Sequence, residues 1–174
     1  MTPRDWGLAS AALALALDQG SKLLLLYVFR FIELCSPSVD MCPQRVGVPV
    51  LSFFDLVMLW NPGVSYGLFP AHGLLGTAIL AIFSLAAVAA LAWWLWSEQR
   101  KIMAVGLGLV IGGALGNLID RLIYQKVADF FHFYVGGYDW YVFNVADCAI
   151  TVGVAALLYD ALLRPEPEAV GTDG

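Results

Sequence analysis

The sequence predicts an all-α membrane protein: a four-transmembrane-helix bundle with a small β-rich subdomain at the extracytoplasmic membrane interface. Hydrophobic residues make up 60% of the 174 positions, and charged residues only 13%. The mean hydropathy of +0.77 exceeds what a soluble domain of this length normally reaches. Four apolar stretches are long enough to cross a hydrocarbon core, which takes about 20 helical residues.

The apolar stretches predict one integral membrane domain over residues 1–164. The spans are expected at 6–29, 74–96, 102–119 and 143–163. A cleaved signal peptide is the alternative for the first stretch, but its apolar run resumes after Lys22 and so reaches spanning length. Residues 165–174 are expected to form a disordered cytoplasmic tail, because they contain Pro, Glu and Gly without apolar periodicity.

Four spans place both termini on one side of the membrane and the loops 30–73 and 122–142 on the other. The first loop is rich in Pro, β-branched and aromatic residues, which predicts short strands at the interface. Positive charges divide evenly between the two sides. The dense pair Arg100 and Lys101 favours a cytoplasmic location for the termini.

Charge and cysteine content exclude several classes of partner. The net charge of -5 and the absence of a basic patch argue against nucleic acid. Cys35, Cys42 and Cys148 form no C-x-x-C motif, so metal binding through sulfur is not expected. If the first loop faces an oxidising compartment, a disulfide between Cys35 and Cys42 is a reasonable hypothesis.

Polar residues inside the expected spans are costly and therefore informative. Asp18 and Lys22 lie four positions apart, so they share a helix face and can form a structural ion pair; a catalytic role is the alternative. Gly108, Gly112 and Gly116 form a stripe that permits close helix packing.

The third span ends in a polar turn that contains Asn117, Asp120 and Arg121. A snorkelling Arg121 paired with an acidic neighbour would explain the arginine at the interface. That interpretation does not explain why a polar Asn117 lies in the span, and this favours a polar site that meets water or a partner chain.

Two carboxylates can meet on the same side of the membrane as the third loop. Asp129 lies in that loop, and Asp147 shares a face with Asn144 at the start of the fourth span. The alternative for Asp129 is a turn or cap residue, and His132 is expected to be a hydrogen-bonded structural group. Residues in the first and third loops, and at the ends of the third and fourth spans that face this same side of the membrane, can converge at one depth. They are Asn61, Asn117, Arg121, Asp129, Asn144 and Asp147.

Two close carboxylates in a low-dielectric pocket cannot both be ionised, so they share one proton. One then acts as a base toward water and the other as an acid toward the developing oxyanion, without a cofactor or metal. Neighbouring Asn and Arg side chains can orient a substrate carbonyl. The site therefore predicts aspartic-protease chemistry.

Five motifs follow one another along the chain: DQGSK (18–22), NPGVSYGLF (61–69), GGALGNLIDRL (112–122), VADFF (127–131) and FNVADCAI (143–150). In order and spacing they resemble those of lipoprotein signal peptidase, or signal peptidase II, a family of bacterial inner-membrane aspartyl peptidases. The likeness extends over all four spans. After Gly63 the second motif departs from the family's usual N-x-G-A-A-F.

The resemblance implies an enzyme that removes prolipoprotein signal peptides, cleaving before a cysteine that carries diacylglycerol. It implies a catalytic pair, Asp129 and Asp147. The residues implied for substrate binding are Asn61, Asn117, Arg121 and Asn144. Those implied as supporting are Asp18, Lys22, Gly63 and Asp120.

The implied partners are the diacylglyceryl-prolipoprotein substrate, membrane lipid and globomycin-type inhibitors. The implied location is the bacterial inner membrane, with cytoplasmic termini and the active site toward the periplasm. We expect a monomer. Two other classes remain open: a small proton-coupled transporter or channel, which would distribute polar residues through the bilayer depth, and a non-enzymatic scaffold.

Overall fold

Four long helices form a bundle in the computed structural model, which describes residues 1–38, 47–63 and 73–163. Their bounds are α1 Pro3–Leu23, α3 Gly73–Ser97, α4 Lys101–Tyr124 and α5 Val145–Leu163. A π-helical turn over Leu24–Val28 extends α1 and precedes the short helix α2, Phe31–Leu34. All four long helices are long and apolar enough to cross a membrane. The predicted fold class is therefore confirmed. The expected tail lies outside the described residues.

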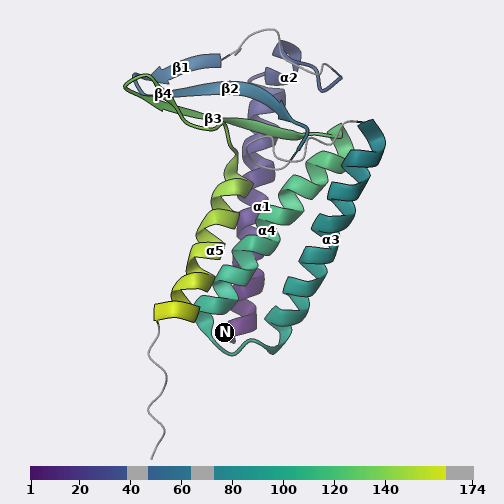
Figure 1. Cartoon of the computed structure of the whole chain (residues 1–174), viewed down its shortest axis with the longest axis vertical. Coiled ribbons are helices and arrows are strands. Elements are labelled where there is room, and N and C mark those ends of the chain that lie inside the picture. The colour runs from purple at the N-terminus through teal and green to yellow at the C-terminus, as the bar shows by residue number, and fades with distance from the viewer. Residues whose placement is uncertain (39–46, 64–72, 164–174) are drawn as a thin grey trace, which may run out of the picture.

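The helix α4 lies between its neighbours, and glycines on two of its faces permit close approach (Figure 1). Gly108, Gly112 and Gly116 face α1, where an added Cβ would collide with α1 atoms. The predicted stripe is thus used for helix packing. The sequence reading missed Gly113 on the other face, which lies against the backbone of α5.

Several helix ends differ from the expected spans; α1, for example, begins at Pro3, three residues earlier than the expected start at 6. The helix α4 continues to Tyr124, beyond the expected end at 119. It can do so because Asp120 and Arg121 find partners inside the protein and remain helical. The helix α5 begins at Val145, two residues later than expected, because Asn144 caps it.

A four-stranded antiparallel sheet lies across one end of the bundle (Figure 1). Its order is β1-β2-β3-β4, with bounds Gly47–Leu51, Phe54–Asn61, Val127–Val135 and Tyr138–Asp139. Strands in the first loop were expected, but the expected third loop also contains β3 and β4. The run VADFFHFYV is rich in aromatic and β-branched residues, which favour a strand. Asp129 is therefore a strand residue, and its interpretation as a turn residue was wrong.

The inner side of the sheet covers a hydrophobic cluster at the top of α1. Leu26, Met58, Trp60 and Phe130 are buried in it. The indole of Trp60 donates a hydrogen bond to the carbonyl of Cys35 at 2.9 Å. Trp60 is therefore a core residue of this cluster.

Cys35 is buried and disulfide-bonded. Its expected partner, Cys42, lies outside the described residues. Cys148 is a free cysteine on α5. A cross-link at Cys35 restrains the chain next to the cluster on which the sheet rests.

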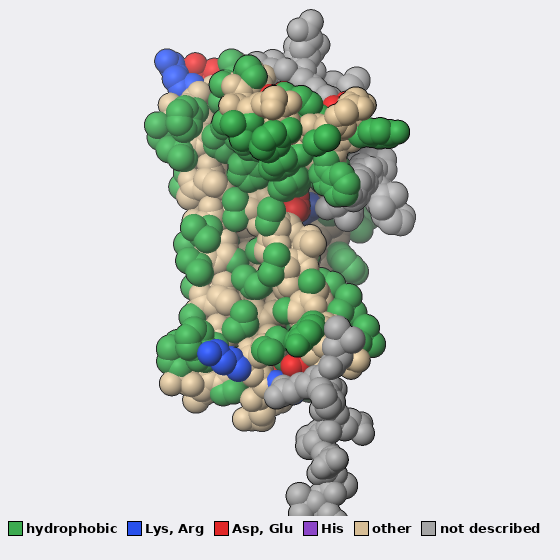
Figure 2. All heavy atoms as spheres, turned by 90° about the vertical axis from the view of Figure 1, so that its left-hand side faces the viewer, with side chains coloured by type: hydrophobic (Ala, Val, Ile, Leu, Met, Phe, Trp, Pro, Cys, Tyr) green, Lys and Arg blue, Asp and Glu red, His purple; other side chains and the backbone are tan. Residues whose placement is uncertain are grey.

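Arg100 joins two helices at the end of the bundle opposite the sheet. Its guanidinium contacts Glu98 at 3.1 Å, next to the end of α3, and Asp160 on α5 at 2.6 Å. Nearby, Lys101 lies 4.0 Å from the centre of the Trp6 ring. Figure 2 shows hydrophobic side chains along the shaft of the bundle, and charged ones mainly at its two ends. This distribution suits a multi-pass membrane protein.

Candidate active site

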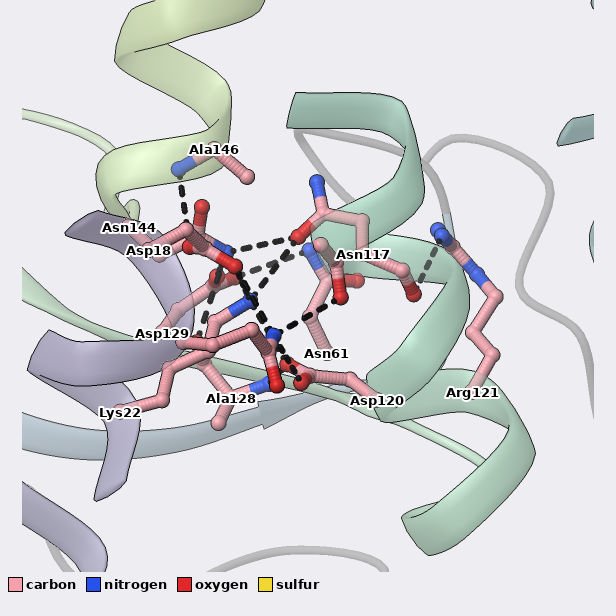
Figure 3. A network of polar contacts seen from close by, with 12 residues as sticks. Asp18, Lys22, Asn61, Asn117, Asp120, Arg121, Ala128, Asp129, Asn144 and Ala146 are labelled. Carbon is pink, nitrogen blue, oxygen red and sulfur yellow. Dashed lines mark hydrogen bonds and ion pairs between the residues drawn. The ribbon is translucent and has the colours of Figure 1, made fainter. Parts of the chain in front are cut away.

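The polar residues selected from the sequence meet where the bundle joins the sheet (Figure 3). Local structure explains their positions. The chain leaves α4 at Tyr124 and enters β3 three residues later, so Asp129 lies close to the end of α4. Antiparallel pairing places Asn61, the last residue of β2, opposite Val127. The start of α5 completes the junction.

Asp129 is fully buried, and both of its carboxylate oxygens accept hydrogen bonds. The amide of Asn144 donates to Oδ1 at 2.6 Å, and the amide of Asn61 donates to Oδ2 at 3.1 Å. Burial raises the pKa of the Asp129 carboxyl well above its usual range, and the nearby charge of Asp147 raises it further. The Asn61 and Asn144 amides and the Lys22 cation act in the opposite direction. Asp129 is thus suited to retain a proton.

Asp147 lies in the first turn of α5, in a capping box with Asn144. The backbone N–H of Asp147 donates to Asn144 Oδ1 at 3.0 Å, and the backbone N–H of Asn144 points to Asp147 Oδ2 at 3.4 Å. The carboxylate also accepts a hydrogen bond from the amide of Asn117 at 3.0 Å. The helix N-terminus favours negative charge at this position.

Two asparagines connect the carboxylates. Asn144 donates its side-chain N–H to Asp129, accepts the backbone N–H of Asp147 at its side-chain Oδ1, and directs its backbone N–H to the Asp147 carboxylate. Asn117 donates to Asp147 and accepts from Asn144 at 3.1 Å. The structure therefore brings Asp129, Asp147, Asn61, Asn117 and Asn144 into one hydrogen-bonded network.

Arg121 lies at the margin of this network (Figure 3). Its guanidinium donates to the backbone carbonyl of Asn117 at 3.2 Å and to that of Gly63 at 2.9 Å. Gly63 in turn donates its N–H to the side chain of Asn61 at 3.0 Å. Arg121 therefore holds the end of β2 against α4 and still lines the cavity beside Asp147.

The Asp18–Lys22 pair is present, with Lys22 Nζ 2.8 Å from Asp18 Oδ2. Lys22 lies at the same distance from Asp120 Oδ2. The alternative that would pair Asp120 with the neighbouring arginine is therefore wrong. Because α1 packs closely on α4, a buried cation on α1 is near enough to reach Asp120.

Sequence reasoning missed two members of the network. Gln19 donates to both Asp18 and Asp120, at 3.1 and 3.4 Å. Gln19 lies within the motif DQGSK, and this position was the signal that could have indicated it. The Tyr141 hydroxyl lies 2.7 Å from the amide of Asn61, and no helical or motif pattern marked it.

Two hollows border Asp147. The first has a volume of about 320 Å³ and lies between α3, α4 and α5. Its polar end contains Asn61, Asn117, Arg121 and Asp147, and its walls include Leu80, Phe83, Val110 and Ile150. The second, of about 440 Å³, is lined by Trp140, Tyr141, Phe143, Asp147, Cys148, Thr151 and Val152. A polar centre with apolar walls suits a substrate that has both a peptide bond and long apolar parts.

The carboxylates at the junction are engaged by Lys22, asparagine amides and backbone N–H groups rather than gathered around a metal site. Within residues 1–38, 47–63 and 73–163, no group of three or more His, Cys, Asp or Glu residues is arranged to hold a metal ion.

Comparison with known proteins identifies the family. The family model described as "Signal peptidase (SPase) II" matches residues 10–163. A lipoprotein signal peptidase of Rhodopseudomonas palustris strain TIE-1 is 51% identical, over 94% of this chain and 95% of the relative. A lipoprotein signal peptidase of Nitrobacter hamburgensis is 47% identical, over 94% of this chain and 96% of the relative.

The fold is also found among solved structures. One titled "Bacterial membrane enzyme structure by the in meso method at 2.3 A resolution" has a TM-score of 0.73. It is 23% identical in sequence and covers 94% of this chain and 93% of its own. This likeness concerns the fold alone. The sequence relatives and the family model together show that the chain belongs to the signal peptidase II family.

Proposed function

We propose that this chain is an aspartic endopeptidase that removes signal peptides from diacylglyceryl-modified prolipoproteins, cutting just before the lipidated cysteine. Membership of the signal peptidase II family supports proteolysis of prolipoproteins. The observation that carries the catalytic assignment is the bridge through Asn144, which contacts both Asp129 and Asp147. It links a fully buried carboxyl group to a helix-terminal carboxylate in a network that one shared proton would balance.

The reaction uses the two carboxyl groups in complementary roles. The ionised member removes a proton from water as the water oxygen attacks the scissile carbonyl carbon. The protonated member donates to the carbonyl oxygen as negative charge develops there. When the tetrahedral intermediate collapses, the carbon–nitrogen bond breaks and the leaving amine takes a proton from the pair.

The surroundings of Asp147 fit the two kinds of surface in the substrate. The amides of Asn61 and Asn117 lie at the polar end of the smaller hollow, where they can orient backbone carbonyls. The apolar walls formed by Leu80, Phe83 and Ile150 offer a place for an acyl chain or an apolar side chain of the signal peptide. A globomycin-type inhibitor would compete for the same space.

The proposed orientation rests on the dense pair of cations Arg100 and Lys101 at the end opposite the site, because the total of positive charges divides evenly between the two ends. The helices α1 and α4 both begin at the end of the bundle away from the sheet (Figure 1), and Arg4, Arg100 and Lys101 lie at these two helix starts. The positive-inside rule then assigns the termini to the cytoplasm, and the sheet and active site to the periplasmic side of the inner membrane. We further propose that the enzyme acts as a monomer.

The transporter alternative finds no support. Its expected distribution of polar groups through the bilayer depth differs from the clustering of the network where the bundle joins the sheet. A purely structural scaffold would tolerate the loss of either proposed catalytic carboxyl group. That expectation provides the test.

The test compares Asp129→Asn and Asp147→Asn with Asp55→Asn. Asp55 lies on the same sheet but bonds to the Tyr134 hydroxyl, at 3.2 Å, and so provides the same chemical change outside the network. Purified variants are incubated with a lipid-modified prolipoprotein, and cleavage is followed by its shift on a gel. Both site variants should lose at least about 1,000-fold in rate, because neither can share a proton. Asp55→Asn should cleave like wild type. Cleavage retained by either site variant would refute the assignment.

A further inference from the structure

We propose that Lys22 is a positioning residue that holds the two catalytic aspartates in register through a pair of buried carboxylates, Asp18 and Asp120. The inference rests on the proposed function, since it assumes that Asp129 and Asp147 are the catalytic pair. It assigns Lys22 a task beyond neutralising a neighbour on its own helix: joining the backbone segments that carry the reacting groups.

The first element of the proposal is the contact geometry of Lys22. Its ammonium group lies 2.8 Å from Asp18 Oδ2 and 2.8 Å from Asp120 Oδ2. The third contact is with Asn117 Oδ1, at 3.3 Å. An ammonium group has three donors, and each one therefore meets a buried oxygen.

Each carboxylate then reaches one catalytic segment. Asp18 Oδ1 accepts the backbone N–H of Ala146 at 2.9 Å, and Ala146 directly precedes Asp147. Asp120 Oδ2 accepts the backbone N–H of Ala128 at 3.0 Å, and Ala128 directly precedes Asp129. Because Ala146 and Asp147 lie in one helical turn of α5, and Ala128 and Asp129 in one strand, β3, holding the amide N–H of the alanine restrains the regular segment that carries the aspartate.

The two connections are equivalent, although the segments differ in structure. One runs from α1 to the first turn of α5, and the other from α4 to the start of β3. Lys22 is the point at which they meet (Figure 3). A shift of its ammonium group would move both catalytic side chains relative to each other, and near-attack geometry is sensitive to shifts of about 1 Å.

The energetics favour a positioning role over simple stabilisation. The exposed fractions of Asp18, Lys22 and Asp120 are 0%, 2% and 1%. Burying three charges costs desolvation energy that their attraction barely offsets, so hydrophobic side chains of similar volume would hold helices together at least as well. Gly116 leaves room for the Asp18 carboxylate against α4. The three charged groups are therefore better explained by a role in positioning the segments that carry Asp129 and Asp147.

Lys22 also acts on the pair through its charge. The charged and titratable groups near Asp129 are Asp18 and Lys22 on α1, Asp120 and Arg121 on α4, Asp147 on α5, and Tyr141. The Lys22 cation lowers the pKa of the Asp129 carboxyl. Removing the cation should therefore shift the pH profile of cleavage upward, an effect that loss of packing alone would not produce.

The test separates geometry from charge with two variants. Lys22→Met removes the cation and leaves its two partners with a net charge of about -2. The double variant Lys22→Met with Asp120→Asn restores the net charge of about -1 that wild type has, and the amide oxygen introduced at position 120 can still accept the Ala128 N–H. Folding is checked by size-exclusion chromatography and thermal unfolding in detergent, and kcat, KM and the pH profile of cleavage are measured.

Both folded variants should have a kcat at least about 30-fold below that of wild type, with KM changed less than about threefold, because substrate contacts remain while the catalytic pair is misplaced. Only Lys22→Met should shift the pH profile upward. A kcat within about threefold of wild type in either folded variant would overturn the inference. Failure of both variants to fold would also overturn the inference, because Lys22 and its two carboxylate partners would then serve the stability of the fold. Activity retained by Asp129→Asn would instead refute the proposed function.

Discussion

Replacing Asn144 separates two tasks that the residue performs at once. Its side-chain oxygen Oδ1 caps α5 by accepting the Asp147 N–H, and its side-chain N–H donates to Asp129 at 2.6 Å. Asn144→Ala removes both interactions. Asn144→Ser keeps a cap, because a serine hydroxyl can accept the same N–H, but is too short to bridge to Asp129.

The structure sets the expected size of each effect. Leaving a buried hydrogen-bonding group such as Asp129 Oδ1 without its partner costs about 1–3 kcal/mol, and a lost N-cap costs about 1 kcal/mol. Asn144→Ala should therefore lower the free energy of unfolding by about 3 kcal/mol, and Asn144→Ser by about 2 kcal/mol. Both should reduce kcat by about 100-fold, or about 2.7 kcal/mol of transition-state stabilisation, because the bridge between the carboxyl groups is gone.

The assay pairs thermal unfolding in detergent with cleavage of a lipid-modified prolipoprotein. Stability should fall from wild type to serine to alanine, while the two variants show equal losses of activity. If Asn144→Ser cleaves within about threefold of the wild-type rate, the bridge is dispensable and the reasoning fails. Equal stability of the two variants would instead refute the capping role.

Three further predictions address the two carboxyl groups Asp129 and Asp147, the contact between α1 and α4 at Gly116, and the end of the bundle opposite the sheet. The rate of cleavage should follow a bell-shaped pH profile: it falls as pH rises through the raised pKa of Asp129, because the shared proton leaves, and it falls in acid when Asp147 is also protonated. Gly116→Ala should lower thermal stability by about 1–3 kcal/mol and reduce kcat, because its Cβ would collide with the Asp18 carboxylate; unchanged unfolding in detergent would contradict this. Arg100→Met should lower the melting temperature through the loss of its two ion pairs but leave kcat within about twofold, and a large loss of kcat would show that the far end influences the site.

Much of the site could be predicted because its signals are local along the chain. Asp18 and Lys22 are spaced for one helix face, and they form the ion pair that this spacing indicates. Asn144 and Asp147 are spaced as a capping pair in the first turn of a helix. Such relations depend on helical periodicity, which a short stretch of sequence expresses.

Other features depended on segments distant in sequence. No strand was predicted in the third loop, yet β3 forms there because β2 is available as an antiparallel partner. The alternative of pairing Asp120 with Arg121 relied on their adjacency along the chain, but the Asp120 carboxylate pairs with Lys22 on another helix. Gln19 and Tyr141 likewise join the network through contacts with residues distant in sequence.

By itself, the sequence determined the four membrane-spanning helices, the glycine stripe and the identity of most of the polar residues at the site, because apolar length, helical spacing and short motifs are written within single segments. Only the tertiary structure decided which oxygen each cation and amide meets, and that one lysine links the segments bearing Asp129 and Asp147. These pairings depend on how closely α1 approaches α4 and on the register of β2 and β3, which packing of the whole chain sets.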